Sequence, residues 1–154
     1  MIGRIVLQHA AIDAMKAEMR RVLLTETGGP MAGYTEGGAV IVTEAAGPGP
    51  RARLRPCSVT IDGRSAQHFC AAAYQRSQGR FDYVGDWHCH LGFSLAPSDM
   101  DVTAMETMAE FEFSPTISPV SLIWSKWSKK RAGYVYDGEA SLRQVSVSCG
   151  TNWR

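Results

Sequence analysis

The run FDYVGDWHCH at residues 81–90 constrains the fold most, because its aromatic and β-branched residues predict a strand that ends on two histidines. A short loop follows, and Ser98 then stands where the N-cap of a helix is expected. Side chains two apart on a strand point to the same face, so His88 and His90 face one way and Cys89 faces the other. The chain therefore places a histidine pair at a strand end, directly before a capped helix.

Apolar periodicity and turn residues predict the remaining elements. Helices are expected over residues 9–24, 65–78 and 98–113, and extended runs over a hairpin around 34–38 and over 57–62, 81–90, 120–125, 131–137 and 141–148. The resulting order is α, ββ, β, α, β, α, βββ. This order favours an α/β fold, in which a single mixed β-sheet is flanked by helices.

Composition narrows the class of protein. The 154 residues suit one domain over 1–154, and a net charge of +1 favours neither a nucleic-acid partner nor a membrane-surface partner. No apolar run approaches the roughly 20 residues that span a bilayer, and the N-terminus lacks a signal-peptide pattern, so a cytoplasmic location is expected. The four cysteines lack paired spacing. We expect free, mostly buried thiols and no cysteine-rich zinc knuckle.

The histidine pair predicts a metal site when Asp101 is added. Ser98 and Asp101 fit a helix capping box, which explains these two residues but leaves the histidines unexplained. Two imidazoles and one carboxylate form a three-ligand zinc set with an open position, as catalytic sites have. Such a site also needs a general base from elsewhere in the chain.

The spacing of His88, His90, Ser98 and Asp101 resembles the HxHx(7)SxxD signature of the JAMM, or MPN-plus, metalloproteases. These zinc isopeptidases remove ubiquitin and ubiquitin-like proteins. The resemblance covers about residues 10–125 and implies the cytidine-deaminase-like JAB/MPN fold of that family. The chain departs from the family at one position, where Leu91 replaces the usual proline, a residue that shapes the loop and is not a ligand.

A second block, ETGGPMAGYTEGG at residues 26–38, resembles the segment in which prokaryotic members carry a glutamate before a Gly-Gly pair. By this match Glu26 is the catalytic glutamate. Carried over residue by residue, the resemblance assigns Zn²⁺ as the cofactor and Glu26 as base and acid. It assigns stabilisation of the oxyanion to Ser98 and zinc binding to His88, His90 and Asp101.

The resemblance implies a zinc-dependent isopeptidase or peptidase that cleaves after the C-terminus of a ubiquitin-like protein, in deconjugation or in precursor processing. Bacterial ubiquitin-like antiviral defence, with E1-like and E2-like enzymes as partners, is one implied context, and sulfur-carrier proteins are another. We expect the substrate tail to pair with a strand edge between Arg51 and Asp62.

Two other functions fit parts of the pattern. MPN-like domains also act as scaffolds, usually with a ligand lost, and none is lost here. The RadC group of DNA-associated proteins shares the HxH and SxxD pattern, but the near-neutral charge argues against DNA binding.

For the second N–H of a bound histidine, either Asp86 or a backbone carbonyl would be a suitable acceptor.

Overall fold

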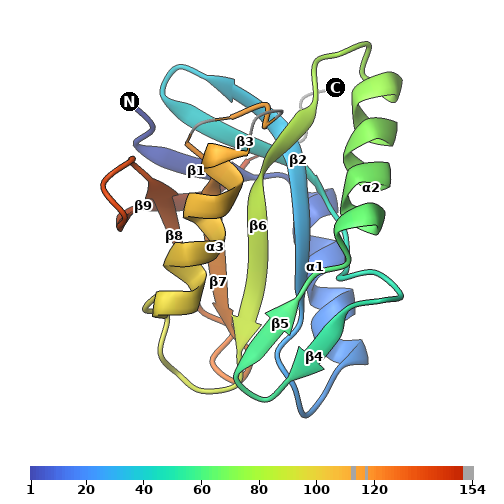
Figure 1. The fold of residues 1–154 in the computed structure, drawn as a ribbon, viewed down its shortest axis with the longest axis vertical. Coiled ribbons are helices and arrows are strands. Elements are labelled where there is room, and N and C mark those ends of the chain that lie inside the picture. The colour runs from blue at the N-terminus through green and yellow to red at the C-terminus, as the bar shows by residue number, and fades with distance from the viewer. Residues whose placement is uncertain (112–113, 117, 151–154) are drawn as a thin grey trace.

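The main sheet of the protein closes on itself. The computed structural model describes residues 1–111, 114–116 and 118–150 (Figure 1). The strands of this sheet are β1 (Arg4–Leu7), β2 (Gly28–Glu36), β3 (Ala39–Ala45), β6 (Asp82–His90), β7 (Val120–Ser125), β8 (Arg131–Tyr136) and β9 (Leu142–Cys149). They are hydrogen-bonded in the order β1-β3-β2-β6-β7-β8-β9, and the parallel pair of β1 and β9 joins the two ends. The predicted mixed α/β architecture is confirmed, with a barrel-like closure that the element order alone did not predict.

Helices cover both faces of the sheet. The helix α1 (His9–Arg21) packs on β3, and its buried residues enter the main core. On the other side, α2 (Gly63–Arg76) packs against β2 and β6, and α3 (Asp99–Glu110) packs against β7 and β8. Figure 1 shows α2 and α3 in front of the sheet and α1 behind it. The central strand β6 therefore has one face toward the core around α1 and the other toward α2 and α3.

The end of β6 alternates as the sequence predicts. Trp87 and Cys89 are fully buried in the core around α1, whereas the rings of His88 and His90 lie together on the opposite face. Trp124 of β7 is also buried, and its indole nitrogen lies 3.3 Å from the sulfur of Met15. Both tryptophans therefore belong to the core.

Several elements differ from expectation. The strand β1 was not predicted, because its four residues are too few for a periodic signal and its partners β3 and β9 are distant in sequence. The strand expected over 57–62 is shorter and forms a separate two-stranded sheet from β4 (Arg53–Arg55) and β5 (Ser58–Thr60). The helix expected to reach residue 113 ends at Glu110, and Phe113 lies outside the described residues.

The four cysteines are free, as predicted, but only Cys70 and Cys89 are buried, whereas Cys57 and Cys149 are exposed. The expectation that most of them are buried is therefore wrong, because one lies in the turn between β4 and β5 and one at the end of β9. Among the described residues, no helix combines the length and the hydropathy needed to cross a lipid bilayer.

The pairing of β2 with β6 requires a glycine beside a predicted metal ligand. Gly28 pairs with His88, and a Cβ atom at Gly28 would lie 2.3 Å from the carbonyl oxygen of Trp87 and 2.8 Å from the Cβ of His88. We expect Gly28→Ala to push β2 away from β6 and to lower the free energy of unfolding by about 1–3 kcal/mol. Denaturant unfolding measures this change.

Gly63 at the start of α2 is the matched control, because a Cβ there meets no atom within 4 Å. Gly63→Ala should be neutral or stabilising by up to about 1 kcal/mol. Equal effects of the two substitutions would contradict the steric argument.

Candidate metal centre

The predicted ligands converge where the end of β6 meets the start of α3. The Nε2 atoms of His88 and His90 are 3.0 Å apart. The Oδ1 atom of Asp101 lies 3.2 Å from Nε2 of His88, and its Oδ2 atom lies 3.6 Å from Nε2 of His90. One potential ligand atom from each residue lies within 4.8 Å of the others. Folding thus brings the three side chains together around one point.

The N-cap of α3 and the candidate metal centre share a carboxylate. The Ser98 hydroxyl accepts a hydrogen bond from the backbone N–H of Asp101 at 3.2 Å, and Oδ2 of Asp101 accepts one from the backbone N–H of Ser98 at 2.6 Å. This capping box fixes the first turn of α3 while Oδ1 faces His88. The structural and the metal-binding interpretations of Asp101 are therefore compatible.

The tautomer of His90 favours metal binding. Its Nδ1 atom lies 3.0 Å from the backbone carbonyl oxygen of Ser94, and a carbonyl can only accept, so Nδ1 carries the proton of the neutral ring. The lone pair is then on Nε2, which faces His88 and Asp101. For His90 a backbone carbonyl, rather than Asp86, is the acceptor of the second N–H.

The loop after His90 is held by hydrogen bonds without the usual proline. The hydroxyl of Ser125 donates to the carbonyl of Gly92 at 3.0 Å, and the Tyr134 hydroxyl donates to the carbonyl of Leu95 at 2.7 Å. These contacts anchor the loop to β7 and β8. They explain how Leu91 can replace proline while the carbonyl of Ser94 still reaches His90.

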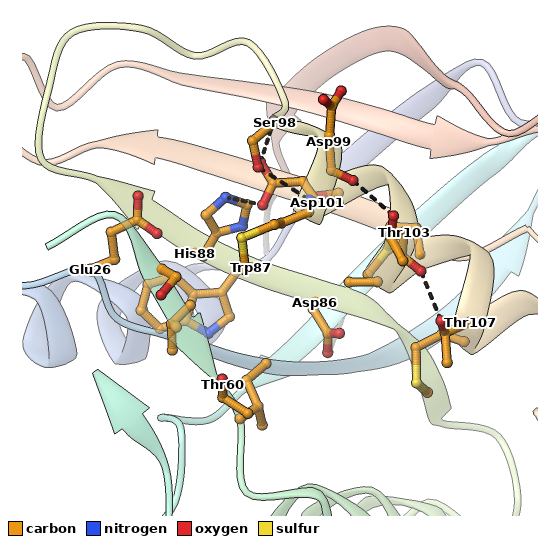
Figure 2. A pocket seen from close by; sticks show the side chains of 18 of the residues that line it. Glu26, Thr60, Asp86, Trp87, His88, Ser98, Asp99, Asp101, Thr103 and Thr107 are labelled. Carbon is orange, nitrogen blue, oxygen red and sulfur yellow. Dashed lines mark hydrogen bonds and ion pairs between the residues drawn. The ribbon is translucent and has the colours of Figure 1, made fainter. Parts of the chain in front are cut away.

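Glu26 reaches the centre from a different part of the chain. It lies just before β2, and its backbone N–H donates to the carbonyl of Arg55 in β4 at 2.8 Å. The next residue, Thr27, accepts from the backbone N–H of Cys89 at 2.9 Å. Glu26 is only 8% exposed, and Figure 2 shows it beside His88 at one end of the pocket. The backbone hydrogen bonds to Arg55 and Cys89 therefore hold Glu26 and Thr27 from two sides.

Burial and charge perturb the ionisable groups of the centre. Burial raises the pKa of Glu26 above its ordinary value, although the charges of His88 and His90 oppose this shift. Burial alone would also raise the pKa of Asp101, but hydrogen bonds to both histidines lower it well below its usual range. The hydrogen bond to Asp101 raises the pKa of His90, against the effect of burial. Asp101 thus favours its ionised form, whereas Glu26 binds a proton more readily than an exposed glutamate does.

The centre opens into a groove of about 710 Å³ between β5, β6 and α3. Ser98 and Asp101 line one wall, and β5 forms the other. Asp99 is exposed at the rim. An extended chain in this groove would pass the metal ligands, Glu26 and Ser98 together.

Asp86 lies on the floor of the same groove, although the sequence interpretation left it outside the site. Figure 2 shows its carboxylate between Thr60 of β5 and Thr107 of α3. Burial raises its pKa to about 7, and nearby Tyr83 and His88 oppose the shift. Tyr83 is close enough to influence Asp86, yet its hydroxyl makes no hydrogen bond of good geometry with any described residue. The position of Asp86 two residues before His88, on the same face of β6, was the signal in the sequence for this placement.

The donor set fits a divalent transition metal. Two imidazole nitrogens and one carboxylate oxygen suit zinc and leave a coordination position unfilled by protein. Cys89 is on the opposite face of β6 and cannot join them. Within the described residues, this is the one group of three or more such side chains close enough to hold a metal ion.

Comparison with known proteins supports the JAB fold and a JAB-domain family. A search of curated protein sequences returns no match. The solution structure of protein DSY2949 from Desulfitobacterium hafniense is similar, with a TM-score of 0.71 and 18% sequence identity over 96% of this chain and 94% of that one. At this identity the likeness concerns the fold alone. The model for prokaryotic homologs of the JAB domain matches residues 8–135, and the chain belongs to this family.

Proposed function

We propose that the protein is a zinc-dependent isopeptidase or peptidase that cleaves after the C-terminal tail of a ubiquitin-like protein. The observation that carries this proposal is the convergence of His88, His90 and Asp101 beside a buried glutamate with a raised pKa. A three-ligand site alone could be a structural centre. A separate base at its open side, at the end of a groove, is what hydrolysis requires.

Each residue has a distinct role in this proposal. Zinc, held by His88, His90 and Asp101, would supply a Lewis acid that lowers the pKa of water to about 7 and polarises a carbonyl. Glu26 takes the proton from the attacking water and returns it to the leaving amine, a task that a carboxyl with a raised pKa performs well. Ser98 can still donate its hydroxyl proton toward the developing oxyanion, because its oxygen only accepts within the cap.

The groove suggests the form of the substrate. A chain between β5 and α3 must be extended, and the short strand β5 offers a main-chain edge for pairing, as expected for the segment between Arg51 and Asp62. The flexible C-terminal tail of a ubiquitin-like protein has this form. E1-like and E2-like enzymes that make such conjugates are the partners we propose, with antiviral defence as one setting.

The metal content tests the site. Purified wild-type protein should contain about one zinc per chain, because three ligands converge on one point. His88→Ala should lose most of the metal, since an open site depends on each ligand. Metal analysis by mass spectrometry measures both, with His68→Ala, on the exposed side of α2, as the control. Equal zinc content in wild type and His88→Ala would refute the centre.

The affinity for zinc should depend on pH. Hydrogen bonding to Asp101 raises the pKa of His90, so zinc must displace a proton from this residue once the pH falls below that raised pKa. The zinc dissociation constant should therefore rise by about tenfold for each pH unit below that pKa and level off above it. Chelator competition between pH 8 and pH 6 measures this. A constant affinity across that range would show that His90 is not a ligand.

Glu26→Gln separates an enzyme from a scaffold. Glutamine keeps nearly the same shape and leaves the ligands in place but cannot accept the proton. Zinc content and binding of an uncleaved ubiquitin-like conjugate should remain, whereas turnover should fall by on the order of 10²- to 10⁴-fold. Turnover of tail-fused and isopeptide-linked substrates measures the effect.

Glu36→Gln is the matched control, because Glu36 is exposed at the end of β2. It should leave turnover unchanged. Full activity of Glu26→Gln would remove Glu26 from the mechanism. A zinc-loaded wild type that binds but never cleaves such substrates would instead favour the scaffold.

A further inference from the structure

The groove has an acidic lining beyond the metal centre. Glu26, Asp86, Asp99 and Asp101 line it, and no lysine or arginine does so among the residues that the structure describes. Glu26 and Asp101 have roles at the metal centre, and Asp99 is exposed at the rim. Asp86 is therefore the carboxylate on the groove floor whose presence hydrolysis does not explain.

Asp86 faces the groove because it stands two residues before His88 on β6, where side chains two apart share a face. The register with β2 shifts on the other side of Gly85, so Val84 leaves this alternation and points into the core. Its neighbour Tyr83 makes no well-formed hydrogen bond to it. The strand thus directs a carboxylate with spare acceptor capacity into the space where a substrate would lie.

Asp86 also lies where two cavities meet. A second cavity of about 620 Å³, between α2, β6 and the end of α3, shares Ile61, Asp86 and Met108 with the groove. No lysine or arginine lines this cavity either, within the described chain. A substrate chain that runs from the metal centre toward the second cavity must pass over Asp86.

Asp86 is already partly buried, and a chain in this path would remove its carboxylate further from water. An unpaired charge in such a place costs several kcal/mol. A substrate that brings a cationic side chain removes this penalty and gains a charge-assisted hydrogen bond. Asp86 is two residues from His88, or about 7 Å along the strand. An extended substrate covers this distance in about two residues.

We propose that Asp86 determines specificity by binding a lysine or arginine side chain of the substrate tail, about two residues before the residue that supplies the scissile carbonyl. The inference rests on the proposed function for the direction and position of the tail. The groove itself carries the charge argument, because within the described residues no lysine or arginine of the protein lines it to pair with Asp86.

Fluorogenic heptapeptides test the inference. Each peptide ends in two glycines followed by the coumarin leaving group, so the last glycine supplies the scissile carbonyl. The second, third or fourth residue before this glycine is Arg, Lys, Gln or Glu. At one of these positions the wild type should prefer Arg or Lys over Gln by about tenfold in kcat/KM, with Glu disfavoured. Asp86→Asn should reduce the preference to within about twofold and keep its zinc.

Asp99→Asn is the matched control, because it removes an equal charge from the exposed rim of the same groove. It should keep the preference at that position. An Asp86→Asn variant that retains the full preference, or a wild type with none, would overturn the inference.

Binding separates this inference from the proposed function. Zinc-loaded Glu26→Gln protein, titrated with the same peptides by fluorescence anisotropy, should bind the Arg peptide about tenfold more tightly than the Gln peptide. The wild type could cleave none of the peptides while the selective binding persists and is lost with Asp86→Asn. In that case the proposed hydrolysis is refuted and the inference stands. Equal affinity for the two peptides, including no binding of either, overturns the inference even where cleavage occurs.

Discussion

The carboxylate of Asp101 is the group on which helix geometry and metal chemistry both depend. One of its oxygens closes the capping box with the backbone N–H of Ser98, and the other faces His88. A cap of this kind contributes about 1 kcal/mol to a helix. Because α3 begins at the metal centre, the same contacts that start the helix also set the position of a ligand. Loss of Asp101 would thus disturb helix and centre together.

Glu26, the general base in our proposal, is fixed by contacts that span the chain. The backbone of Glu26 is hydrogen-bonded to β4, and the backbone of Thr27 to the end of β6. The side chain of Thr27 also donates to Glu18 of α1 at 2.9 Å. These restraints hold a buried carboxyl beside two histidines, where burial raises its pKa. An exposed glutamate in a mobile loop would have neither property.

In our proposal the groove combines this centre with a means of selecting substrates. The metal ligands and Glu26 lie at one end, and Asp86 lies on the floor toward the cavity beside α2. Chemistry and recognition thus share the strand β6, since His88, His90 and Asp86 all project from one face of it. A rigid central strand is a suitable support, because catalytic groups must be held within fractions of an ångström.

The sequence by itself determined the local parts of the centre. The two-residue spacing in a strand placed His88 and His90 on one face, and the cap pattern placed Ser98 and Asp101 in one helical turn, because both periods are properties of the backbone. Family resemblance was needed for Glu26. Only the tertiary structure decided the closure of the sheet through β1, the contact of Glu26 with β4, and the place of Asp86 between two cavities. These features depend on pairing and packing between segments far apart in the chain, and local periodicity carries no information about such contacts.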